Sequence, residues 1–211
     1  MYNIAREIDE ILDPIIFDAS HELKGHCLFE HVISDRDLKL KLKYMRKAQY
    51  GEIVIASRFF SKEQARKVIY MLLKKNESAI ITWRKELDEP YLEIEGNFRE
   101  AIGEGIAKNT DFNNLFPLHR LRVVLVKGDS IGRAFYIKTA YPVNSISDNE
   151  AIYNAMDNWA EKKKSKKIII SLPEIFRRAF SFIIKLSKRK MEENKYDLQQ
   201  RNSKRTQKLH Q

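Results

Sequence analysis

The spacing of hydrophobic residues predicts helices in the first 75 residues of the chain. In residues 4–12 the apolar positions recur every three or four residues, which is the period of one helix face, and Pro14 interrupts this segment. A second, short helix is expected in residues 23–31. A third begins after Ser61, which forms a capping-box pattern with Gln64. Its buried face is predicted to contain Ala65, Val68, Ile69, Leu72 and Leu73.

Residues 37–44 alternate between leucine and lysine, and their pattern supports two interpretations. Strict alternation is typical of a half-buried strand. A leucine at every fourth residue, after a start at Ser34 or Asp35, fits a helix instead, and we favour the helix. Residues 52–60 are predicted to form a strand in which Ile53, Val54 and Ile55 are buried.

Strand patterns dominate after a further short helix in residues 79–85. Strands are predicted at 91–95, 102–106, 121–126 and 134–141, and the glycine-containing segment 127–132 joins the last two as a hairpin. Helices first and strands later indicate an α+β fold, in which N-terminal helices pack on a twisted antiparallel sheet.

The C-terminal part of the chain is predicted to be helical and basic. A polar stretch at 143–149 suggests a domain boundary, and a short helix at 151–159 is expected to dock on the body through Ile152, Met156 and Trp159. A long helix with one basic side follows Ser171. The predicted organisation is a lead-in at 1–20, the α+β domain at 21–145 and a partly disordered basic helical tail at 146–211.

The net charge of +10 is concentrated at the C-terminal end. The first 160 residues carry 23 Lys/Arg and 24 Asp/Glu, whereas the remaining 51 carry 16 and 5. Such a tail is attracted to phosphate, in RNA or on an anionic membrane, although a solvated end that only aids solubility has the same composition. No signal peptide or transmembrane segment is expected.

The candidate chemistry depends on histidine and lysine. The single Cys27 excludes an internal disulfide framework, and no Walker, GxGxxG, HExxH or GxSxG pattern occurs. His21, His26 and His31 are spaced by five residues, which rotates successive side chains by about 140° on a helix, so they do not share a face as zinc ligands would. An imidazole near a lysine suits opening of RNA at its own 2′-hydroxyl, without a metal or other cofactor. A lone histidine, however, is more often a packing residue.

Several short segments, in the same order along the chain, resemble one bacterial family. They are GH at 25–26 with HV at 31–32, ASRF at 56–59, Trp83, GEGI at 103–106, RVVLV at 122–126 and YIKTAYP at 136–142. Together they resemble the RNase A-like toxin domain at the C-terminus of CdiA proteins, which act in contact-dependent growth inhibition. The resemblance implies a pancreatic-ribonuclease-like fold without its disulfides.

The resemblance also implies an active site. The histidine of the HV element corresponds to His31, and the Thr and Tyr of TAYP correspond to Thr139 and Tyr141. The family usually has an arginine on the helix after HV, and Lys41 occupies that place here, with Lys43 as second choice. Lysine is a point charge and cannot bind a phosphate bidentately as arginine does. His26 matches the GH position as a secondary candidate that could instead face the core.

These residues predict a metal-independent endoribonuclease toxin, with tRNA among its candidate substrates. His31 would be the general base, Lys41 would offset phosphate charge, and Tyr141 would orient the phosphate or protonate the leaving 5′-oxygen. Thr139 would bind a base edge or a phosphate oxygen. The products would be a 2′,3′-cyclic phosphate and a free 5′-hydroxyl. The enzyme would act in the cytoplasm of a target bacterium, and a cognate immunity protein is expected as its partner.

Two non-enzymatic alternatives use the basic tail. The chain could be a nucleic-acid-binding module, although the near-neutral body does not favour this. It could also be a peripheral membrane protein anchored by the apolar side of residues 175–186.

Overall fold

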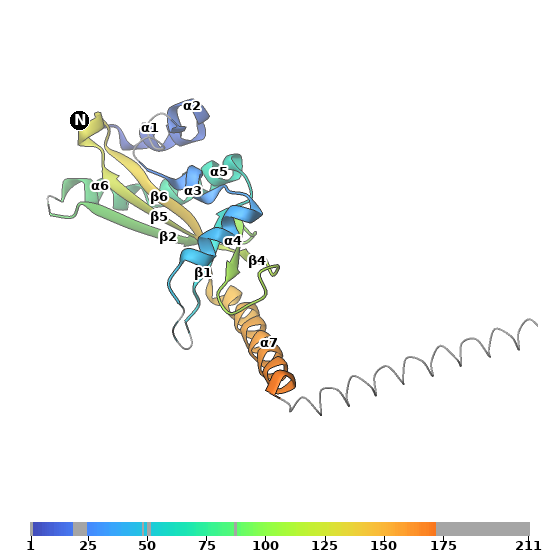
Figure 1. Ribbon diagram of the computed structural model, residues 1–211. Helices are drawn as coiled ribbons and strands as arrows, with labels where there is room; N and C mark the ends of the chain where they lie inside the picture. Colours follow the sequence, from blue (N-terminus) through green and yellow to red (C-terminus); the bar gives the residue numbers. More distant parts are fainter. Residues whose placement is uncertain (1, 19–24, 48, 50–51, 87, 172–211) are drawn as a thin grey trace, which may run out of the picture. The chain divides into compact units, whose positions relative to one another are not determined.

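The computed structural model describes residues 2–18, 25–47, 49, 52–86 and 88–171, and within these the side chains of Cys27, Phe29 and 166–171 are not described. The chain divides into two compact units, Met1–Ala160 and Glu161–Gln211. The strands described below all belong to the first unit (Figure 1). In the second unit, residues 161–171 are helical.

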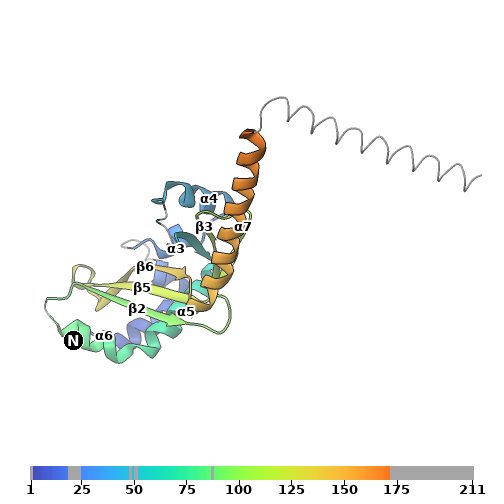
Figure 2. The same ribbon diagram turned by 90° about the horizontal axis from the view of Figure 1, so that it is seen from below.

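The strands form two antiparallel sheets of three strands each. The first contains β1 (Ile55–Phe59), β3 (Gly103–Ala107) and β4 (Phe116–Leu118), in the order β1-β3-β4. The second contains β2 (Tyr91–Asn97), β5 (Arg120–Lys127) and β6 (Phe135–Val143), in the order β2-β5-β6, and these strands run side by side in Figure 2. The predicted α+β class with antiparallel strands is confirmed, and the short β4 is an addition to the predicted elements.

The hairpin between β5 and β6 turns through a 3-10 helix, η3 (Asp129–Ile131). Gly132 follows it with φ of 70°, a left-handed conformation that glycine adopts without steric cost. The sequence predicted this hairpin from its glycines, and the structure confirms it.

The N-terminal segment contributes to the main core. It forms α1 (Ile4–Asp9), η1 (Glu10–Leu12) and α2 (Pro14–Phe17). The interruption predicted at Pro14 is confirmed, because Asp13 is extended and caps α2 by accepting from the backbone of Ile15. Ile8, Ile11 and Phe17 have no exposed surface and pack in the same core as the second sheet. The predicted lead-in is therefore part of the same packed unit.

Two consecutive helices cover this core, α5 (Lys62–Lys75) and α6 (Glu77–Lys85). All five residues predicted for the inner face of α5 are buried. The predicted capping box forms only by half. Ser61 accepts from the backbone N–H of Gln64 at 3.1 Å, but the Gln64 amide donates to the carbonyl of Ala101 at 3.2 Å instead of reaching back to Ser61.

Two short helices bring the chain to the first sheet, α3 (Cys27–His31) and α4 (Asp35–Tyr44). The helical interpretation of α4 is confirmed, with Ser34 accepting from the backbone N–H of Asp37. Its leucines at 38 and 42 pack against Ala56 and Ile106. The helix predicted from residue 23 begins at Cys27 among the described residues, and His21 lies outside them.

The strand predicted at 52–60 is shorter than expected. It is β1, Ile55–Phe59. Val54 is buried as predicted, whereas Ile53 and Ile55 are only partly buried, which corrects the prediction for these two. Ile55 begins the edge strand β1 and Ile53 precedes it. Both pack on the outside of a small hydrophobic cluster formed by Ala107, Phe116 and Ile152.

The last described helix is α7 (Ile146–Ser171), which is longer than the predicted 151–159. Ile152 is buried and Met156 partly buried against Ala107 and Phe116, so the predicted docking through these two residues is confirmed. Trp159 is only partly buried. The predicted helix beyond Ser171 and the basic tail lie outside the described residues. No helix in the described part of the chain is long and apolar enough to cross a bilayer.

The polar stretch 143–149 is bound tightly into the first unit. Asp148 is buried and accepts from the backbone N–H of Ser145 at 2.8 Å and of His119 at 3.2 Å. The ring of His119 also lies 2.7 Å from the same carboxylate. These bonds lower the pKa of Asp148 against the opposing effect of burial, which is the largest single influence.

Candidate active site

His31 ends helix α3 and is buried, with only 6% of its surface exposed. The Nζ atom of Lys41, on α4, lies 3.2 Å from its Nδ1 atom and also 3.2 Å from the backbone carbonyl of Glu30. A protonated lysine has no lone pair, so Nδ1 must be the acceptor in this contact. The neutral ring then carries its proton on Nε2.

Strand β6 supplies the other two predicted residues. The hydroxyl oxygen of Thr139 lies 3.5 Å from Nε2 of His31. The ring of Tyr141 stacks on the imidazole, with 5.1 Å between centroids and 19° between planes. The structure thus brings His31, Lys41, Thr139 and Tyr141 together around one imidazole, although they come from three separate elements.

A β-bulge in β6 turns Thr139 and Tyr141 toward His31. Thr139 pairs with Val124 and Ile137 pairs with Leu125, which leaves Lys138 as an extra residue. Before the bulge the buried positions are 135 and 137, and after it they are 140 and 142. Without the extra residue, the alternation of a strand would direct positions 139 and 141 into the core.

The same bulge fixes the start of α3. The backbone N–H of His26 donates to the carbonyl oxygen of Lys138 at 3.1 Å. His26 is the N-cap residue of α3, and its own carbonyl accepts from the backbone N–H of Glu30 at 3.0 Å. The bulge therefore ties the helix that carries His31 to the strand that carries Thr139.

The electrostatic environment keeps His31 neutral. Burial, and then the charge of Lys41, lower its pKa to about 3, while a hydrogen bond to the backbone of Ser57 opposes them. Burial also lowers the pKa of Lys41, against the attraction of Glu30. At neutral pH the site therefore holds a neutral imidazole whose Nδ1 lone pair faces the amino group of Lys41.

The two secondary candidates lie in different places. His26 does not face the core: its side chain is 41% exposed, its Nε2 lies 3.9 Å from a carboxylate oxygen of Glu30, and its ring centroid lies 6.4 Å from that of His31. Lys43 is exposed, because two residues along a helix rotate the side chain by about 200° relative to Lys41. Of the two lysines, Lys41 is the one that lies beside His31.

Sequence reasoning missed Glu30. Its spacing of four from His26 could have indicated it, because side chains at i and i+4 of a helix are neighbours. One potential metal-ligand atom from each of His26, Glu30 and His31 lies within 4.8 Å of the others, so the three could bind one metal ion. The ammonium of Lys41, 3.2 Å from His31, repels a second cation at the same place.

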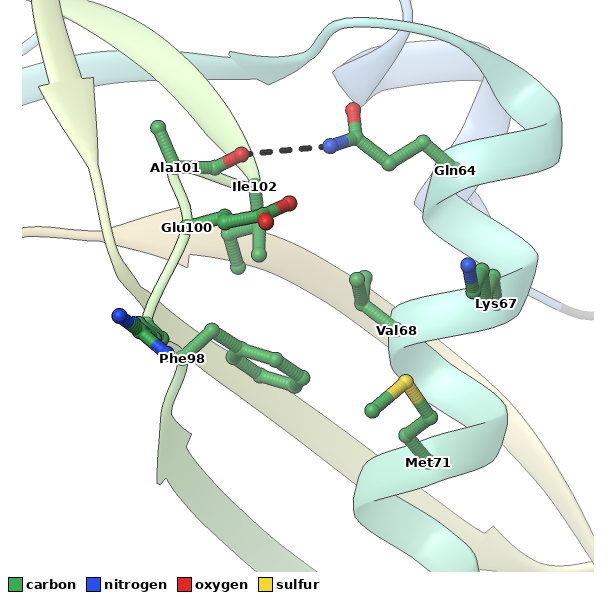
Figure 3. Close-up of a pocket in the computed structure, with 9 residues that line it drawn as sticks. Gln64, Lys67, Val68, Met71, Phe98, Glu100, Ala101 and Ile102 are labelled. Atoms are coloured by element: carbon green, nitrogen blue, oxygen red, sulfur yellow. Dashed lines mark hydrogen bonds between the residues drawn. The ribbon is translucent and has the colours of Figure 1, made fainter.

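A groove of about 620 Å³ borders this cluster and is lined by Lys41, Glu30, Asp37 and Lys62. Leu28, Val32 and Ile33 form an apolar part of its wall, and Lys41 is the residue that it shares with the cluster around His31. A separate pocket of about 270 Å³ lies between α5 and residues 98–102. Figure 3 shows its apolar wall of Val68, Met71 and Phe98, and none of the clustered residues lines it.

Comparison with known families decides the kind of protein. Residues 25–142 match the family model of the bacterial CdiA-CT RNase A domain. The chain belongs to this family. The matched range begins just before His26 and ends just after Tyr141, so it contains every clustered residue.

One solved structure is also similar, the crystal structure of a CdiA-CT/CdiI complex from Y. kristensenii 33638. The identity is 21% and the TM-score 0.48, and the alignment covers 56% of this chain and 99% of that chain. No curated protein matches the chain.

Membership in the CdiA-CT RNase A family makes this chain a toxin nuclease domain of the ribonuclease type. The family predicted from the sequence is thereby confirmed, and so is the expectation of a fold of pancreatic-ribonuclease type. With a single cysteine, the chain forms no internal disulfide. The enzymatic interpretation is favoured over both alternatives that depended on the tail.

Proposed function

We propose that this chain is a metal-independent endoribonuclease that cleaves RNA by attack of its own 2′-hydroxyl. The observation that carries the proposal is the buried, neutral His31 with the ammonium of Lys41 at 3.2 Å. A neutral imidazole can accept the 2′-hydroxyl proton, and the neighbouring cation can stabilise the charge that develops on the phosphorane.

The contact between Lys41 and His31 implies that the substrate binds before Nδ1 becomes available as the base. In the free enzyme the lone pair of Nδ1 is engaged by Lys41. A bound phosphodiester is an anion and draws the ammonium toward its non-bridging oxygens, which frees Nδ1 for the 2′-hydroxyl. Burial is the main cause of the low pKa of His31, and the negative charge of the phosphate offsets the second cause, the charge of Lys41. Substrate binding thus creates the base that the reaction requires.

The two residues of β6 orient the reacting groups. Thr139, at 3.5 Å from Nε2, is suited to hold the imidazole in its tautomer or to bind a phosphate or base oxygen. Tyr141 stacks on the imidazole and limits the ring to one plane. The 2′-oxygen forms a bond to phosphorus, the bond from phosphorus to the 5′-oxygen breaks, and a 2′,3′-cyclic phosphate and a 5′-hydroxyl result.

The proposed partners follow from this activity. An unrestrained ribonuclease damages the cell that makes it, so a cognate immunity protein is required. The cationic site suggests an acidic partner that covers His31 and Tyr141 with carboxylates in place of phosphate. RNA, including tRNA, in the cytoplasm of a target bacterium is the proposed substrate, and the basic tail is proposed to add affinity for RNA or for an anionic membrane.

The test is cleavage of a defined RNA in excess EDTA, with identification of the products by mass spectrometry. We expect full activity and ends that carry 2′,3′-cyclic phosphate. Loss of activity on chelation, restored by magnesium, would show that the mechanism needs a metal. A linear 3′- or 5′-phosphate as the first product would exclude transesterification.

A further inference from the structure

We propose that His26 is the general acid that protonates the 5′-oxygen as it leaves, so that two imidazoles share the proton transfers. This inference rests on the ribonuclease function proposed above and adds a second catalytic residue to it. The observation behind it is the pair of rings, 6.4 Å apart and tilted by 31°, at the two ends of α3.

The separation suits two groups that serve one phosphorus atom. The entering 2′-oxygen and the leaving 5′-oxygen lie on opposite sides of phosphorus, and each must come within hydrogen-bond reach, about 2.6–3.2 Å, of its catalyst. Two imidazoles whose centroids are 6.4 Å apart can contact both oxygens of one phosphate placed between them.

Two hydrogen bonds fix the backbone of His26, and its side chain is partly exposed to solvent. The N–H of His26 donates to the carbonyl of Lys138 at 3.1 Å, and its carbonyl accepts from Glu30 at 3.0 Å. The side chain is 41% exposed, in contrast to the buried ring of His31. An acid must recover its proton from water after each turnover, and an exposed ring can do this.

The surroundings of the two histidines differ in the way that the two roles require. The base must be neutral, and His31 is buried beside an ammonium. The acid must meet a solvent-accessible leaving oxygen, and His26 is partly exposed, with Nε2 3.9 Å from a carboxylate oxygen of Glu30. Pairs of titratable groups in opposed environments are typical of acid and base partners.

Tyr141 is the competing candidate for the acid. Its ring lies parallel to that of His31 at 5.1 Å, a geometry of packing against the base. A phenol is also a much weaker acid than an imidazolium. The structure therefore favours His26 for the proton and leaves Tyr141 to position the base.

The proton balance is complete without another reactant. Nδ1 of His31 accepts the 2′-hydroxyl proton as the bond between the 2′-oxygen and phosphorus forms. The bond from phosphorus to the 5′-oxygen breaks, and that oxygen takes the ring proton of His26. His31 is then protonated and His26 neutral, and exchange with water restores both.

The test compares two substrates for the intact chain. One is a dinucleotide whose leaving group is an ordinary nucleoside 5′-oxygen, and the other is a nucleoside 3′-phosphate ester of 4-nitrophenol, whose leaving group needs no proton. His26→Ala should lower kcat about 10²–10⁴-fold on the first substrate and less than a few-fold on the second. His31→Ala should lower kcat on both, because both need the base.

Tyr141→Phe is the matched control, and circular dichroism and the melting temperature establish that each variant is folded. If Tyr141→Phe gives the leaving-group dependence and His26→Ala does not, the acid is Tyr141 and the proposal is overturned. Equal losses on both substrates in His26→Ala, or no loss on either, overturn it as well. A wild-type chain that cleaves neither substrate would instead refute the ribonuclease function itself.

Discussion

The Nζ atom of Lys41 lies 3.2 Å from the Nδ1 atom of His31, so a cation engages the lone pair that the proposed reaction needs. The same ammonium contributes to the low pKa of the imidazole, after burial. In the proposed mechanism one side chain therefore suppresses the base in the free enzyme and stabilises the phosphate during the reaction.

Replacement of the base should abolish most of the activity. We expect His31→Ala to lower kcat/KM on RNA by about 10²–10⁴-fold, the usual contribution of one general base. Initial rates on a fluorescent RNA, together with a far-UV circular dichroism spectrum of each protein, provide the measurement. Activity within a few-fold of wild type in a folded variant would mean that His31 is only a packing residue.

The two lysines of α4 provide a matched pair. Lys41→Ala should lower kcat by on the order of 10²-fold, because the charge beside the phosphate is lost. Lys43→Ala removes the same charge from an exposed position of the same helix and should leave kcat within a few-fold. Lys41→Arg should keep much of the activity, since a guanidinium also binds phosphate. The assignment is wrong if Lys43 proves to be the damaging position.

His31 should also make folding stability depend on pH. Its pKa is about 3 in the folded protein and 6.5 in the unfolded chain, so the unfolded chain binds more protons between these values. The contribution of His31 to the free energy of unfolding is present above pH 6.5 and decreases as the pH falls toward 3. Urea titrations at pH 7 and pH 5 should show a smaller loss of stability in His31→Gln than in wild type.

An equal loss in the variant and in wild type would show that other groups, such as the carboxylate of Asp148, account for the whole effect. The pKa of Asp148 is lowered in the folded protein, so its contribution also decreases at acidic pH. Only the difference between the two proteins reports on His31.

The basic tail should add affinity and leave the chemistry unchanged. Residues 161–211 carry 16 Lys/Arg and 5 Asp/Glu, and every proposed site residue lies before Val143. Each neutralised phosphate of single-stranded RNA contributes about −0.7 to the salt slope of binding. A chain shortened to residues 1–160 should therefore show a flatter slope and a higher KM, with kcat within a few-fold.

Both chains should be compared on one RNA at two salt concentrations, with melting temperatures to confirm folding. If kcat collapses in a shortened chain that is still folded, the tail contributes to the active site. An unchanged salt slope would show that the tail charges do not contact the RNA.

The sequence by itself determined the features that depend on local spacing. The inner face of α5 follows from apolar residues three and four apart, and the β5–β6 hairpin follows from alternation around glycines. The order of short motifs identified the family and named His31, Thr139 and Tyr141 in advance. The resemblance also placed Lys41, ahead of Lys43, at the position of the family's usual arginine.

Tertiary structure alone decided how these residues meet. The extra residue Lys138 shifts the alternation of β6, and nothing in the spacing of residues 134–141 indicates it, because a bulge is defined by pairing with β5. The exposure of His26 and its contact with Glu30 depend on how α3 lies on that bulge. The low pKa of His31 likewise arises from burial and from a charge ten residues away. Burial and distance between remote groups exist only once the chain has folded.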